Sequence, residues 1–217
     1  MNLRDAILAE SLPLPPIPAG LMYQYVVAGN GLFIRAEDSR MEAMVPVALA
    51  DVHGLEAVES YARLKAPRVP ANWLWSIQKS ARKHLPNEAM YQLLYNDGWR
   101  CVMPPAQASA AALAYEDRPD AVIDLHSHGT LRAFFSETDD RDEQGFRFYV
   151  VVGRVGHSIV DLADSPQIAA RVGIFGHYEN VSIGDIFAGD SPFVQVDPDV
   201  ETMLEEEGDG QADKFII

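Results

Sequence analysis

The sequence contains a single cysteine, Cys101, among its 217 residues. This scarcity excludes an intramolecular disulfide framework, and it also excludes zinc or iron–sulfur sites built from several cysteines. No run approaches the roughly 20 consecutive apolar residues that a membrane-spanning helix requires. Residues 1–18 lack the basic segment and apolar run of a secretion signal. We therefore expect a soluble, cytoplasmic protein that makes no membrane contact.

Basic residues are also scarce, because 17 Lys and Arg stand against 32 Asp and Glu, giving a net charge of −15. Such a chain repels phosphate backbones and anionic lipids, so we expect no direct nucleic-acid partner. More than half of this net charge comes from eight acidic residues between Asp197 and Asp213, a stretch without Lys or Arg. We predict that residues 191–217 form an acidic, flexible tail.

The remaining chain is divided by its prolines and by its apolar pattern, with 48% hydrophobic residues available for a core. Residues 1–20 are predicted to form a proline-rich extended arm because they contain Pro13, Pro15, Pro16 and Pro18. Residues 21–66 form a β-rich N-terminal extension, and residues 67–190 form the main domain. Together with the tail, these segments are our predicted domain organisation.

The expected elements are mostly strands. Two hairpins are predicted around glycine-containing turns, at Tyr23–Ala28 with Leu32–Ala36 and at Met90–Tyr95 with Trp99–Met103. An amphipathic helix is predicted at Ala71–His84, before Pro86. Ala106–Tyr115 is expected to be a short helix or a loop. The other predicted strands are Met44–Ala50, Ala121–Leu125, Phe146–Val152, Ile159–Leu162 and Arg171–Tyr178. This pattern indicates an α+β (mixed α/β) fold, built around one sheet flanked by helices.

The most informative stretch reads IDLHSHGTLRAFFSETDD, from Ile123 to Asp140. His126 and His128 are two residues apart on a strand, so both imidazoles point to the same face. Ser136 can cap a short helix that carries Asp139 three residues later. Two neutral imidazoles and a carboxylate, with a fourth position left open, form a recognised catalytic zinc shell.

Simpler interpretations exist for each part of this pattern. Two histidines can be near each other without a shared ligand, and Asp139 could serve only as a helix-cap acid. The full spacing H-x-H-x7-S-x2-D, however, should occur by chance in about one in a thousand sequences of this composition. Asp124 lies on the same strand face as His126 and could orient an imidazole.

The string H-S-H-x7-S-x2-D resembles the JAMM motif of the JAB/MPN metalloprotease family, and the resemblance extends over about Ala71 to Tyr178. It implies a JAB/MPN-like fold with zinc bound by His126, His128 and Asp139, and with Ser136 stabilising the oxyanion. The family also uses an upstream glutamate as general acid and base. Glu88 matches it, 38 residues before His126, and Glu116 is the alternative.

Two positions depart from the family pattern. Gly129 stands where many members have proline, and Tyr91 stands where many have glycine three residues after the glutamate. The second departure weakens the assignment of Glu88.

The whole chain also resembles the JAB-type proteins of bacterial PRTRC-type cassettes, through AGNGLFIRA, the motif segment and RVGIFGHYE. This resemblance implies a ubiquitin-like protein or a peptide as substrate, and an activating-enzyme-like cassette partner. The leading hypothesis is therefore a zinc-dependent peptidase or isopeptidase. The alternatives are a non-catalytic JAB-fold binding module and a purely structural metal site, which would generally need a fourth protein ligand.

Overall fold

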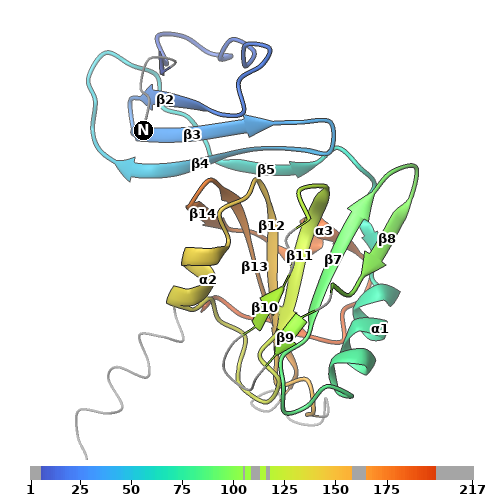
Figure 1. Cartoon of the computed structure of the whole chain (residues 1–217). Helices are drawn as coiled ribbons and strands as arrows, with labels where there is room; N and C mark the ends of the chain where they lie inside the picture. Colours follow the sequence, from blue (N-terminus) through green and yellow to red (C-terminus); the bar gives the residue numbers. More distant parts are fainter. Residues whose placement is uncertain (1–5, 105, 109–112, 116–117, 158–164, 199–217) are drawn as a thin grey trace, which may run out of the picture.

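The computed structural model describes residues 6–104, 106–108, 113–115, 118–157 and 165–198. Strands dominate this part of the chain, with short helices between them, which confirms the mixed α+β class (Figure 1). None of the helices in the described ranges is long and apolar enough to cross a membrane. Most of the predicted acidic tail and the predicted strand at Ile159–Leu162 lie outside the described residues.

The N-terminal segment forms a five-stranded sheet in the order β1-β2-β3-β4-β5. Its strands are β1 (Ile7–Leu8), β2 (Gln24–Ala28), β3 (Gly31–Glu37), β4 (Met41–Leu49) and β5 (Tyr61–Leu64). The predicted hairpin is confirmed, because β2 and β3 pair antiparallel across the Gly29–Asn30 turn. The Asn30 amide fixes this turn by hydrogen bonds of 2.8 and 3.0 Å with the backbone of Val58.

The second sheet has seven strands and contains the predicted motif. Its main order is β14-β13-β12-β11-β7-β8, with β16 paired to β13. The strands are β7 (Met90–Tyr95), β8 (Trp99–Val102), β11 (Ala121–Ser127), β12 (Arg147–Gly153), β13 (Gln167–Ile174), β14 (His177–Asn180) and β16 (Val194–Gln195). β11 lies in the middle, antiparallel to β7 and parallel to β12.

Short elements complete the structure. Helix α1 (Asn72–Ala81) lies beside β7 and β8, and helix α2 (Glu137–Asp142) lies at the opposite side of the sheet (Figure 1). The remaining elements are α3 (Ile183–Ile186) and the pairs β6 (Val69–Pro70) with β15 (Phe187–Ala188) and β9 (Ala106–Ala108) with β10 (Leu113–Tyr115). Helix α1 confirms the predicted helix, although it ends at Ala81 and is followed by turns.

Two sequence expectations were wrong. The segment Ala106–Tyr115 contains two antiparallel strands, so backbone pairing overrides the helix preference of its alanines. Arg171–Tyr178 was expected to be one strand, but β13 and β14 form a hairpin there. The chain reverses at Phe175 and Gly176, whose φ angles are +49° and +84°. A non-glycine residue in this left-handed region is uncommon, which explains why the sequence pattern did not indicate the turn.

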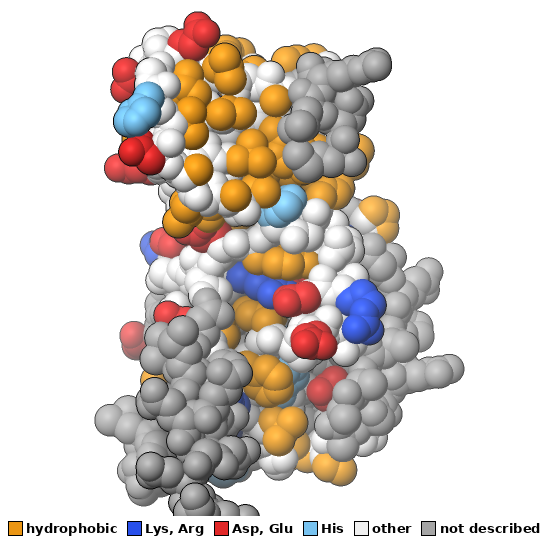
Figure 2. Space-filling model, turned by 90° about the vertical axis from the view of Figure 1, so that its left-hand side faces the viewer, with side chains coloured by type: hydrophobic (Ala, Val, Ile, Leu, Met, Phe, Trp, Pro, Cys, Tyr) orange, Lys and Arg blue, Asp and Glu red, His pale blue; other side chains and the backbone are white. Residues whose placement is uncertain are grey.

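The two sheets share one hydrophobic core. Ile34 and Met41 of the N-terminal sheet belong to the same cluster of buried side chains as Leu125 and Val150 of the seven-stranded sheet. Figure 1 shows the N-terminal sheet above the other sheet, with its strands running across the lower ones. Figure 2 shows the face that carries α2, where hydrophobic side chains cover much of the upper part and acidic side chains lie along one margin of it, while basic and acidic side chains gather just below the middle.

The shared core can be tested with Ile34→Ala. Because Ile34 is fully buried, this change should lower the free energy of unfolding by about 2–5 kcal/mol. All three tryptophans lie at Trp73, Trp75 and Trp99, outside the N-terminal sheet, so their fluorescence reports on the other part of the molecule. We expect this signal to shift to lower denaturant concentration together with the far-UV circular dichroism.

The matched control is Leu49→Ala in the neighbouring strand β4. Leu49 is 77% exposed, so its loss should change stability by no more than about 0.5 kcal/mol. An unchanged tryptophan transition in Ile34→Ala would contradict a common core.

Candidate metal centre

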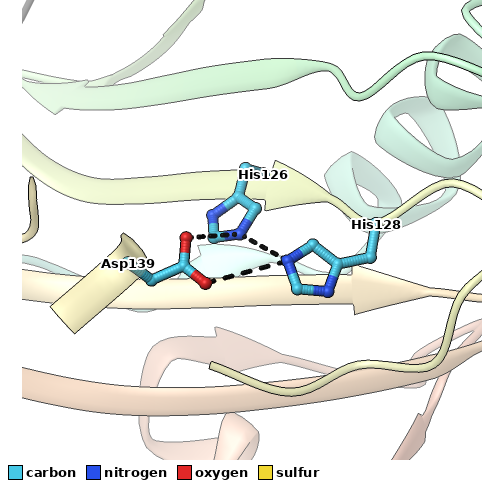
Figure 3. A group of neighbouring side chains, drawn as sticks. All are labelled: His126, His128 and Asp139. Atoms are coloured by element: carbon cyan, nitrogen blue, oxygen red, sulfur yellow. Dashed lines mark hydrogen bonds and ion pairs between the residues drawn. The ribbon is translucent and has the colours of Figure 1, made fainter. Parts of the chain in front are cut away.

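Strand β11 carries His126, and His128 follows directly after its last residue, so that the two imidazoles meet. The strand is buried along its whole length, and His126 pairs in register with Met90 on one side and Val151 on the other. The side chains of His126 and His128 are only 8% and 6% exposed. Their Nε2 atoms face each other at 3.1 Å (Figure 3).

Helix α2 supplies the third group, Asp139. Its Oδ1 lies 3.3 Å from Nε2 of His126, and its Oδ2 lies 3.8 Å from Nε2 of His128. The helix begins with a capping box, in which Ser136 Oγ accepts from the Asp139 backbone N–H and the Asp139 carboxylate accepts from the Ser136 N–H. The cap therefore fixes the orientation of the carboxylate relative to the helix.

The spacing of these three groups fits a metal ion. Zinc holds nitrogen and oxygen ligands at about 2.0–2.2 Å, so neighbouring ligand atoms of a tetrahedral site lie about 3.3–3.6 Å apart. The three separations measured here are 3.1, 3.3 and 3.8 Å. All the candidate ligand atoms lie within 4.8 Å of one another. His126, His128 and Asp139 therefore form a candidate metal centre, and three ligands leave one position of a four-coordinate ion to a further ligand.

The electrostatics of the site also suit a cation. Burial lowers the pKa of His126 and His128 below the usual histidine range, so both rings are neutral near pH 7 and each has a nitrogen lone pair. Burial by itself would raise the pKa of Asp139, but His126 and the hydrogen bonds from Ser136 lower it. The centre thus combines two neutral donors with one anionic donor.

Glu88 lies half-buried two residues before β7, and the backbone of the next residue, Ala89, is hydrogen-bonded to the motif. The hydroxyl of Ser127, between the two histidines, accepts from the Ala89 N–H at 3.0 Å, and the Ser127 N–H donates to the Ala89 carbonyl at 2.9 Å. Burial, with a smaller contribution from the Asp139 carboxylate, raises the pKa of Glu88 to about 7. A carboxyl group with this pKa can both accept and donate a proton near neutral pH.

Gly129 explains one departure from the family pattern. Its φ angle is +59°, which proline cannot adopt because its ring fixes φ near −65°. A Cβ atom at this position would also lie 3.1 Å from the Pro86 carbonyl oxygen. The residue after His128 must therefore be small and conformationally free, since the segment before Glu88 packs against it.

Other residues named from the sequence have different surroundings. Asp124 lies on the same face as His126, but its Oδ2 accepts from Arg147 Nη1 at 2.7 Å in a buried ion pair. Ser136 Oγ lies 2.7 Å from Asp139 Oδ2, so its hydroxyl is engaged in the capping box. Glu116 lies outside the described residues. The roles of Glu88 and Ser136 in catalysis stay predictions.

Two charged residues next to the centre were missed by the sequence reasoning. Glu143 follows α2 and lies 3.9 Å from His126 Nδ1, and Arg171 of β13 pairs with Glu143. Both are 5% exposed. The one available signal was an arginine within the otherwise apolar run Ile168–Ile174, which indicates a buried partner.

The motif lies within a segment that matches a known protein family. Residues 70–164 match a family model described as prokaryotic homologs of the JAB domain. No curated protein gives a significant match. Among solved structures, the chain is similar to the solution structure of protein DSY2949 from Desulfitobacterium hafniense, at 15% identity and a TM-score of 0.39. That similarity covers 57% of this chain and 94% of the other.

The ligand assignment predicts that Asp139→Asn loses bound metal. The change keeps the shape of the side chain but removes the anionic donor. Loss of a residue that only orients a metal ligand typically weakens metal affinity by about 10–100-fold. Loss of a ligand itself should weaken zinc affinity by more than this. Elemental analysis after dialysis and competition with a chromophoric chelator would measure this loss.

Asp142→Asn is the control, because Asp142 is an exposed acid of the same helix. It should retain the metal content of the unmodified protein. Equal occupancy in both variants would refute Asp139 as a ligand.

Proposed function

We propose that this chain is a JAMM-type metallohydrolase that uses zinc to cleave a peptide or isopeptide bond. The observation that supports this best is the convergence of His126, His128 and Asp139, together with Glu88, whose pKa is raised by burial and by the Asp139 carboxylate. These are the residue types of a three-ligand catalytic site, and they lie in the segment that matches the JAB-domain family.

Glu88 is the proposed general base and general acid. Its carboxylate accepts a proton from the attacking water, and the resulting carboxylic acid donates that proton to the nitrogen of the leaving amine. A carbon–oxygen bond forms and the carbon–nitrogen bond breaks, with no net change in Glu88. The pKa of about 7 suits both halves of this cycle.

His126, His128 and Asp139 would hold the ion, which supplies Lewis-acid chemistry and lowers the pKa of water to about 7 when bound. Ser136 is the proposed donor to the oxygen anion of the tetrahedral intermediate. Its hydroxyl lies 2.7 Å from Asp139 Oδ2, so in this role its proton turns from Asp139 to the substrate oxygen.

The proposed substrate is the flexible C-terminal region of a ubiquitin-like protein or another peptide. We also propose an activating-enzyme-like partner, as in a PRTRC-type cassette. Both proposals are supported by the resemblance of the sequence to such systems. Incubation of the zinc-loaded full chain with ubiquitin-like proteins encoded beside its gene, with and without a chelator, tests them by mass spectrometry of the products. Binding of such a protein without any cleavage would favour the non-catalytic module instead.

Replacement of the proposed general base separates proton transfer from metal binding. Glu88→Gln should retain zinc, because Glu88 is not one of the three ligands, while the rate of hydrolysis falls by about 10²–10⁴-fold. Metal content by elemental analysis and single-turnover cleavage of the identified substrate measure the two effects.

Glu116→Gln is the comparison variant and should cleave at the unmodified rate. The reverse result, with Glu116→Gln inactive and Glu88→Gln active, would transfer the role to Glu116.

The pH dependence of kcat/KM follows from the same group. Only the ionised carboxylate of Glu88 can accept a proton, and its fraction rises with pH through the pKa of about 7. Activity should therefore fall about tenfold per pH unit on the acidic side. A bound cation favours the carboxylate, so the midpoint should lie between the ordinary value of 4.5 and about 7. Any residual activity of Glu88→Gln should lack this acidic limb.

A further inference from the structure

Helix α2 carries a proposed metal ligand but has no hydrophobic anchor of its own. It consists of six residues, Glu137–Asp142, and none of them is buried. Its capping box joins Ser136 to Asp139 within the same turn, so it fixes the local shape of the helix and not its position on the sheet. Other contacts must hold Asp139 at 3.3 Å from His126.

Arg171 of strand β13 contacts residues that precede and follow Asp139 in the chain. Its Nη1 donates to Asp140 Oδ1 at 2.6 Å, while its Nε and Nη2 donate to Glu143 Oε2 at 3.0 and 2.6 Å. The guanidinium carbon lies 4.0 Å from the ring centroid of Phe135 and 3.8 Å from that of Tyr178. Hydrogen bonding and stacking together give this planar cation a fixed orientation.

Tyr178 strengthens the same attachment. Its hydroxyl oxygen lies 2.7 Å from the Glu143 carbonyl oxygen and 3.0 Å from the Asp140 carbonyl oxygen, at the end of α2. Tyr178 belongs to β14, the strand paired with β13. The β13–β14 hairpin therefore binds the helix through side chains of both its strands.

The second carboxyl oxygen of Glu143 faces His126, the proposed metal ligand in strand β11. Glu143 Oε1 lies 3.9 Å from His126 Nδ1, while the opposite ring nitrogen, Nε2, faces Asp139 and His128. This distance exceeds that of a hydrogen bond, so the interaction is electrostatic. A negatively polarised oxygen beside Nδ1 favours the proton on that nitrogen and leaves the lone pair of Nε2 directed into the centre.

We propose that Arg171 is a positioning residue that joins two metal ligands of different elements. Through Asp140 it fixes the helix that carries Asp139, and through Glu143 it orients the imidazole of His126. The inference rests on the proposed function because it requires a metal at this centre. Arg171 itself does not contact the reacting atoms.

The test measures metal binding by the full chain with the metal ion alone. Loss of a residue that orients a metal ligand typically weakens affinity by about 10–100-fold. We therefore expect Arg171→Met to weaken zinc binding by this factor in chelator competition. The visible absorption of the cobalt(II) form should also change, because it reports the geometry of the ligands and is insensitive to global stability while the protein is folded.

Arg171→Met leaves Glu143 buried without its cation, which could prevent folding. The double variant Arg171→Met/Glu143→Gln replaces the carboxyl group that has lost its partner with a neutral amide, and it should show the same weakened binding and altered spectrum. Arg35→Met is the matched control, because Arg35 is equally buried, at 5% exposure, and pairs with Gln24 in the N-terminal sheet. It should retain the affinity and the spectrum of the unmodified protein.

Three results would overturn the inference. Unchanged affinity and spectrum in the folded double variant would show that Arg171 and Glu143 do not position the ligands, although the proposed function would stand. An equal loss in Arg35→Met would assign the effect to general destabilisation. Absence of metal binding by the unmodified protein would refute the proposed function and this inference together.

Discussion

The burial of strand β11 is the constraint on which the site depends. Hydrogen bonds to β7 and β12 satisfy its backbone on both edges, and every residue from Ala121 to Ser127 is buried. Polar side chains in such a strand carry a desolvation cost, so each needs a partner. Asp124 has Arg147, Ser127 has the Ala89 backbone, and His126 faces a carboxylate at either ring nitrogen.

This constraint also explains the distribution of charge around the centre. Tyr149, Arg171 and Asn180 follow Asp124 in register across β12, β13 and β14, so the row of polar residues continues from the motif strand to the edge of the sheet. Arg147 and Arg171 each bind an acid on this face. The cations thus hold the carboxylates of Asp124 and Glu143 in fixed positions on the face that carries the candidate metal centre, while the opposite face packs into the hydrophobic core.

Much of the fold could be predicted from local patterns. The turn sequences around Asn30 and Asp97 indicated two hairpins, and the spacing of apolar residues indicated α1. The errors arose where a local preference was overridden. In the alanine-rich segment, β9 and β10 pair as strands, and Phe175, beside Gly176, takes a left-handed conformation that is uncommon for a residue other than glycine. The parallel pairing of β1, in the proline-rich arm, with β2 was not predicted either, because no local pattern indicates which strand an extended segment will pair with.

The sequence by itself determined the ligand types of the centre. The two-residue spacing of His126 and His128 on a strand sets both imidazoles on one face, and Ser136 and Asp139 form a cap by local geometry alone. Only the tertiary structure decided that these two local units meet. Their meeting depends on the pairing of β11 with β12 and on Arg171, which lies 32 residues beyond Asp139 in the chain. A long-range ion pair leaves no periodic trace in a sequence, because its partners are fixed by the packing of separate elements.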